Sequence, residues 1–132
     1  MTMEVNWFAV IAAGVSAFML GGIWYGPLFG KMWQAENGLS DEQLAEGNMA
    51  KIFGLALVLS LVAAFVFGMF LGPDVDVQFG AMAGFSAGLF WVGAALGIVY
   101  LFERRSLKHW AINAGYVTLQ FTLYGVIFGL LS

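Results

Sequence analysis

Four long stretches without a charged residue dominate this 132-residue chain. They cover residues 5–26, 52–71, 79–102 and 110–131, and none contains Asp, Glu, Lys, Arg or His. Each has 20 to 24 residues, close to the ~20 that an α-helix needs to cross about 30 Å of hydrocarbon. Because lipid offers no partner to backbone N–H and C=O groups, each stretch predicts a transmembrane helix. We expect an all-α, polytopic membrane four-helix bundle that forms one domain over residues 1–132.

The composition agrees with that prediction. Hydrophobic residues make up 61% of the chain and charged residues 10%, against about 45–50% and about 25% in soluble domains. A chain this short has too small an interior to hide so many apolar side chains, so they must face lipid. We expect the first stretch to remain as a span and not to be a signal peptide, because Met1–Trp7 holds Glu4 and no Lys or Arg.

The basic residues lie in only two of the three loops. They are Lys31, Lys51, Arg104, Arg105 and Lys108. The opposite flanks carry only Glu4, Asp74 and Asp76. Since Lys and Arg near the ends of spans favour the cytoplasmic side, we predict an N-out, C-out orientation.

The loops differ in the structure that they allow. Residues 72–78 form a short polar turn that begins with Gly-Pro, which predicts that the second and third spans are adjacent and antiparallel. The loop over residues 27–51 is longer and contains the capping box Ser40-Asp41-Glu42-Gln43. We therefore expect a short cytoplasmic helix that starts at Asp41 and is interrupted near Gly47-Asn48.

Aromatic residues gather at the end of the first stretch. Pro27 removes a helical hydrogen bond, and Gly26 and Gly30 allow the chain to turn. Trp and Tyr favour the level of the lipid headgroups. We interpret this segment as an interfacial anchor made of Trp24, Tyr25, Pro27, Phe29, Gly30, Lys31 and Trp33.

The same segment carries a resemblance. Residues 24–31, Trp-Tyr-Gly-Pro-Leu-Phe-Gly-Lys, resemble the signature of a family of small bacterial four-helix membrane proteins of unknown function. The similarity extends to residues 6–7, 47–51 and 112–116, and thus covers the chain from end to end. The resemblance implies the fold and a bacterial inner membrane, and it implies no reaction.

Small residues mark faces on which helices can approach one another. Four-residue spacing places them on one face of the third and fourth stretches, at Gly80, Gly84, Gly88, Gly125 and Gly129. Two interpretations stay open. These faces serve packing within one chain, or some of them join chains into a homo-oligomer.

A polar face follows the fourth stretch at steps of three and four residues. It is formed by Asn113, Tyr116, Gln120 and Tyr124. Buried amides and phenols need hydrogen-bond partners. They either join helices or line a polar pocket for a small neutral molecule, and Asn6 and Trp91 are further candidates for both roles.

Several classes of function lose support. The chain has no Cys and one His, His109, so we expect no thiolate or multi-histidine metal site. No ionisable residue lies within a span, which disfavours proton-driven antiport. No nucleophile stands beside a base, and the net charge of −3 gives no basic surface for nucleic acid. We expect no enzyme, no cofactor and no nucleic-acid partner.

An interaction protein remains as the leading hypothesis. Such a protein would self-associate or be accessory to a larger membrane complex, within the bilayer of the bacterial inner membrane. The alternative is a pore or carrier for a neutral or lipid-like small molecule, which would use the polar face of the fourth stretch.

Overall fold

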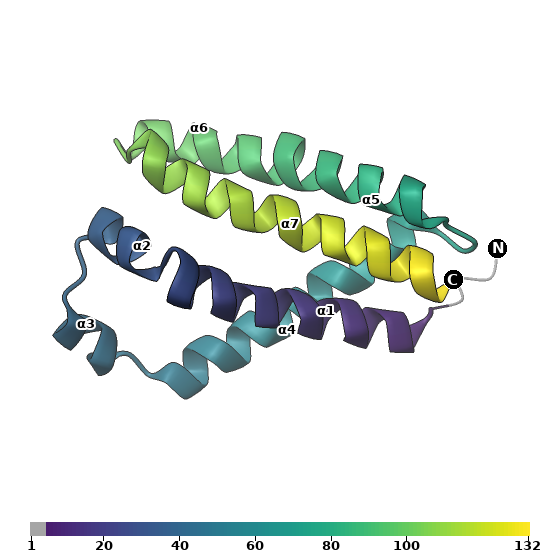
Figure 1. Ribbon diagram of the computed structural model, residues 1–132, viewed down its shortest axis with the longest axis horizontal. Coiled ribbons are helices and arrows are strands. Elements are labelled where there is room, and N and C mark those ends of the chain that lie inside the picture. The colour runs from purple at the N-terminus through teal and green to yellow at the C-terminus, as the bar shows by residue number, and fades with distance from the viewer. Residues whose placement is uncertain (1–4) are drawn as a thin grey trace.

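A computed structural model describes residues 5–132, and Glu4, counted above on the outer flank, lies outside the described residues. Helices make up nearly all of the described chain, and no strand occurs in it (Figure 1). Four helical segments are long and apolar enough to cross a membrane: Trp7–Leu28, Met49–Leu71, Val77–Phe102 and Leu107–Leu131. Each lies within three residues of a predicted stretch at both ends. The prediction of an all-helical chain with four apolar spans is therefore confirmed.

The elements follow one another with short connections. In chain order they are α1 (Trp7–Ile23), the π-helix η1 (Trp24–Leu28), α2 (Gly30–Asn37), α3 (Asp41–Glu46), α4 (Met49–Leu71), α5 (Val77–Ser86), the π-helix η2 (Ala87–Gly93), α6 (Ala94–Phe102) and α7 (Leu107–Leu131). The first span thus consists of α1 and η1, and the third span of α5, η2 and α6.

Side-chain caps explain where most helices begin. Asn6, Asn48, Asp76 and Ser106 each accept a hydrogen bond from the backbone N–H three residues further on, which satisfies a donor that the first turn leaves open. The predicted capping box at Ser40 is present in full, and α3 starts at Asp41. The interruption predicted near residues 47–48 separates α3 from α4.

The first span passes through Pro27 and does not turn before it. Phe29 N–H donates to Trp24 O at 2.8 Å, five residues back. A π-helical turn therefore carries the chain past a residue that has no N–H to give. The span reaches Leu28, two residues beyond its predicted end, and α2 follows at once until Gly38, whose φ of 66° closes the helix.

The central helix of the bundle is α7. It contacts α1, α4 and the whole third span, and in Figure 1 it lies between α1 and the run of α5 and α6. Within residues 5–132, α5, η2 and α6 make no comparable contact with α1 or α4. Figure 1 shows α4 crossing behind α1 and α7. The prediction that the second and third spans lie side by side is wrong. After the turn that follows α4, the third span packs against α7 and not against α4.

Glycines decide that pairing. The five glycines predicted for helix packing all lie where the third span meets α7: Gly80, Gly84, Gly88, Gly125 and Gly129. A Cβ added to Gly80 would overlap the carbonyl of Gly125, and one added to Gly84 would overlap the carbonyl of Phe121. The two backbones therefore touch, which is the arrangement that small residues permit in lipid.

Candidate functional site

A hydrogen-bonded group around Tyr124 joins three helices near the middle of the spans. The Tyr124 side chain is fully buried. Its hydroxyl donates to Ser60 O at 3.0 Å and accepts from Gln120 Nε2 at 2.7 Å. Ser60 Oγ lies 2.9 Å from the same hydroxyl and donates to Gly14 O at 2.9 Å. This Tyr124 cluster ties α7 to α4 and α1.

A second group surrounds Asn113, at the end of the spans that carries the basic loops. The Tyr25 hydroxyl donates to Asn113 Oδ1 at 2.6 Å, and Asn113 Nδ2 donates to the Tyr100 hydroxyl at 2.7 Å. Beside it, Trp24 Nε1 donates to Ile112 O at 2.8 Å. This Asn113 cluster joins η1, α6 and α7.

The π-turn positions the aromatic side chains of the predicted interfacial anchor. Trp24 packs over Gly115, where an added Cβ would lie 2.9 Å from its ring. The ring of Tyr25 packs edge-on against Tyr116 and Trp33, with centroid distances of 5.3 and 5.8 Å. Trp24 and Tyr25 thus serve as contacts between helices.

Of the other residues of the predicted anchor, some pack against the chain and some are exposed. The ring of Phe29 packs on Trp24, with centroids 4.6 Å apart. Gly30 lies against the backbone of Tyr25, where an added Cβ would be 2.6 Å from the carbonyl oxygen. Pro27 and Lys31 are exposed. These two residues can contact lipid headgroups, whereas the rings of Trp24, Tyr25, Phe29 and Trp33 are partly buried in contacts with other side chains.

The polar face predicted on the fourth stretch is distributed over several contacts. Tyr116 donates to Ala17 O at 3.0 Å, while its other members belong to the two clusters. Asn6 lies at the opposite end of the bundle, where its Nδ2 donates to Leu131 O at 3.0 Å. Trp91 stands apart on the outer surface, 74% exposed. In the described chain, no buried side-chain nitrogen or oxygen lacks a hydrogen-bond partner.

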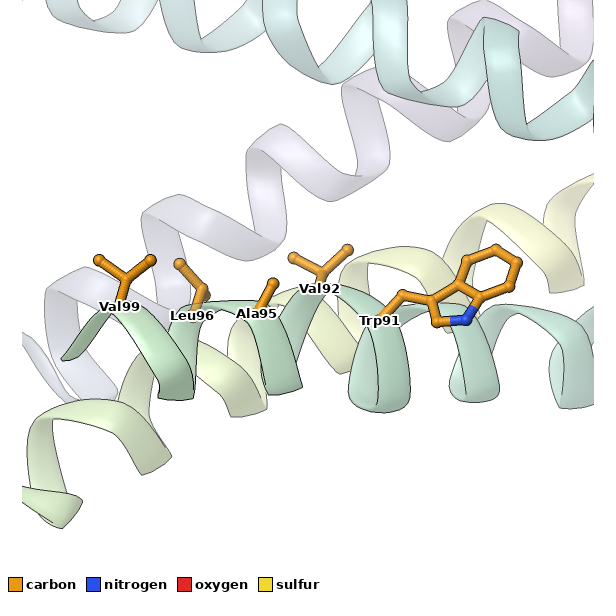
Figure 2. A pocket seen from close by; sticks show the side chains of 5 residues that line it. All are labelled: Trp91, Val92, Ala95, Leu96 and Val99. Atoms are coloured by element: carbon orange, nitrogen blue, oxygen red, sulfur yellow. The ribbon is translucent and has the colours of Figure 1, made fainter. Parts of the chain in front are cut away.

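Two shallow grooves occur on the outer surface, and no residue of the polar face lines either of them. Figure 2 shows a shallow apolar groove of about 400 Å³ along η2 and α6, lined by Trp91, Val92, Ala95, Leu96 and Val99. A smaller groove of about 280 Å³ lies between α6 and the start of α7. Residues 5–132 contain no group of three His, Asp or Glu side chains that could hold a metal ion.

Tyr100 and Trp110 contribute to these contacts but were not identified from the sequence. Tyr100 completes the Asn113 cluster, and Trp110 Nε1 donates to Gly93 O at 2.8 Å. His109 is only 3% exposed and packs on Tyr100 with ring centroids 5.0 Å apart. The available signal was that Tyr100 and Trp110 flank a tight loop, which brings the two ends of their spans together.

Family membership follows from the extent of one match. A family described as protein of unknown function, DUF1761, matches residues 8–129. This chain belongs to the DUF1761 family. The match covers all but the outermost residues of the four spans of this DUF1761 protein and includes both clusters, in agreement with the resemblance to an uncharacterised family. No curated protein and no solved structure matches the chain.

Loss of the Tyr124 hydroxyl tests the first cluster in this DUF1761 protein. We expect Tyr124→Phe to lower the free energy of unfolding by about 1 kcal/mol, because Gln120 and Ser60 lose a buried partner. Helix content followed by circular dichroism during denaturation in mixed micelles measures the change. Ser60→Ala completes a double-mutant cycle. Strictly additive losses would show that the two hydroxyls are not coupled.

Proposed function

We propose that this protein is an integral membrane interaction protein that associates with further copies of itself in the bacterial inner membrane. The observation that carries the proposal is an uncovered face of small residues on α4. The apolar window of α4 is the least buried of the four, with 11% of the residues buried. The first half of α4 bears large apolar side chains that are about half exposed, including Ile52, Phe53, Leu55 and Val58.

A helix face in this region is suited to close approach. Ala50 and Gly54 are four residues apart, both are exposed, and no atom lies within 4 Å of a Cβ added to Gly54. At most other glycines within the spans, a neighbouring side chain or backbone already fills the space beside the Cα. Since small residues at this spacing allow helices to meet in lipid, a second α4 fits this face.

The distribution of basic residues supports a geometry for the assembly. All five lie at one end of the spans, either between spans one and two and between spans three and four or in the first turn of α4 and α7, which favours an N-out, C-out orientation for every copy. Copies inserted in one direction can be related by rotation about the membrane normal. The assembly that we propose is therefore a parallel, cyclic homo-oligomer.

Transport and catalysis have less support. A pore or carrier for a neutral or lipid-like molecule would use Asn113, Tyr116, Gln120 and Tyr124, but these side chains bond to other helices or to each other. The grooves on the surface are mostly apolar and do not include these residues. We therefore propose that the protein is not an enzyme and that its polar groups hold the bundle together.

Cysteine cross-linking tests self-association cleanly because the chain has no Cys. We expect Gly54→Cys to form disulfide-linked dimers when membranes are oxidised. Ala95→Cys is the matched control, since it is also exposed but lies on α6, away from α4. Native mass spectrometry in mild detergent should show an oligomer. A monomeric particle together with equal cross-linking at the two positions would contradict the proposal.

A further inference from the structure

The smaller groove, between α6 and the start of α7, combines an apolar wall with a polar rim. Ala94, Ile98, Leu101 and the Trp110 ring form the wall, and Tyr100 and Arg105 lie toward the end that carries the basic loop. The volume of about 280 Å³ and the open side of this groove suit a chain that lies along the helix. Gly97 faces the ring of Trp110, where an added Cβ would be 3.0 Å from Nε1.

A turn at the end of α6 brings a cation to the rim. Arg104 has a φ of 63°, and its N–H donates to Leu101 O at 3.2 Å. The next N–H, of Arg105, donates to Tyr100 O at 2.9 Å. This pair of bonds folds the chain back over the helix. The Arg105 guanidinium therefore lies 5.4 Å from the centre of the Tyr100 ring, above the groove.

The charges around the rim leave Arg105 able to bind an anion. Its Nε donates to Glu103 Oε1 at 2.7 Å, which uses one of the five guanidinium donors. Ser106 Oγ donates to Glu36, so that a second carboxylate lies nearby. Arg104 on the same loop and Lys108 in the first turn of α7 are both exposed. The three cations outnumber the two carboxylates, so the rim has a net positive charge. The Arg105 guanidinium is partly exposed.

We propose that this groove binds one anionic phospholipid, such as a phosphatidylglycerol. An acyl chain lies along Ala94, Ile98 and Leu101, and the phosphate accepts hydrogen bonds from the remaining donors of Arg105. The Tyr100 ring lies under the headgroup, beneath the guanidinium of Arg105. The Trp110 indole, bonded to Gly93 O, lies deeper and lines the part of the groove that takes the acyl chain. Basic residues at the mouth of an apolar groove select an acidic headgroup over a zwitterionic one. The site does not depend on self-association.

Lipid adducts measure the role of Arg105. The protein is delipidated in detergent, mixed with phosphatidylglycerol or phosphatidylcholine, and analysed by native mass spectrometry. We expect Arg105→Gln to weaken phosphatidylglycerol binding roughly tenfold, because the charge-assisted hydrogen bonds of the guanidinium to the phosphate are lost. Arg104→Gln removes the same charge one residue away, from a side chain that does not line the groove. We expect it to change binding less than twofold.

A pair of bulky substitutions measures the role of the groove. Ala94→Phe fills it, whereas Ala95→Phe adds the same bulk on the neighbouring groove of the same helix. Both positions are exposed, so circular dichroism should show unchanged helix content for both variants. We expect only Ala94→Phe to abolish the adduct. Equal losses for the two arginine variants, or normal binding by Ala94→Phe, would show an unspecific attraction of lipid to the basic loop and would overturn the site.

Discussion

Replacing Gly84 by alanine is expected to lower the free energy of unfolding by about 3 kcal/mol. The added methyl group would overlap the carbonyl of Phe121 and lie 2.9 Å from the Cα of Thr122. Both neighbours are backbone atoms of α7, so no side chain can rotate away. The third span must therefore separate from its only extensive helix partner among the described residues. Denaturation in mixed micelles, followed by circular dichroism, measures the loss.

Gly22→Ala is the matched control for that substitution. Gly22 lies in a span, as Gly84 does, but no atom is within 4 Å of its added Cβ. We expect its stability to be unchanged or slightly raised, since alanine favours the helix over glycine. A similar loss at both positions would mean that glycine acts through helix flexibility and not through the contact with α7.

Asn113→Leu is expected to lower the free energy of unfolding by about 2 kcal/mol. Leucine has as many side-chain heavy atoms as asparagine and the same branching at Cγ, although its two methyl groups are bulkier than the amide. The substitution removes the acceptor for Tyr25 and the donor to Tyr100. Two partly buried hydroxyl groups are left without a partner at a place where three helices meet. The same denaturation experiment measures this change.

The double variant Tyr25→Phe/Tyr100→Phe supplies the background that isolates the hydrogen bonds. Without the two hydroxyls, leucine at position 113 leaves no polar group unpaired, so we expect its cost to fall below about 1 kcal/mol. An undiminished loss in this background would assign the effect to packing of the side chain and not to the bridge between η1, α7 and α6.

Those two sites differ in how far the sequence predicts them. The four-residue spacing of Gly80, Gly84 and Gly88 identifies a packing face, because a helix places such residues on one side. The partner of that face could not be predicted, since several spans carry small residues at similar spacing. In the structure, the partner is α7 and not the span that precedes it in the chain.

The signature around Pro27 shows a similar limit. Its aromatic residues and its place at the end of a span indicate an interface, and the resemblance to an uncharacterised family agrees with the match over residues 8–129. The direction in which Trp24 and Tyr25 point depends on the π-turn. No local sequence pattern predicts the hydrogen bond from Phe29 N–H to Trp24 O that forms this turn. Their partners, Ile112 and Asn113, lie 88 residues further along the chain.

The sequence by itself determined the features that depend on neighbouring residues. Span lengths follow from the absence of charge, and the start of α3 follows from the Ser40 capping box. Only the tertiary structure decided the central place of α7, the poor packing of α4 and the partners of Asn113 and Tyr124. The physical reason is that in lipid every apolar face is equally well solvated. Close backbone contacts and hydrogen bonds between distant residues, not hydrophobicity, therefore select the pairing of helices.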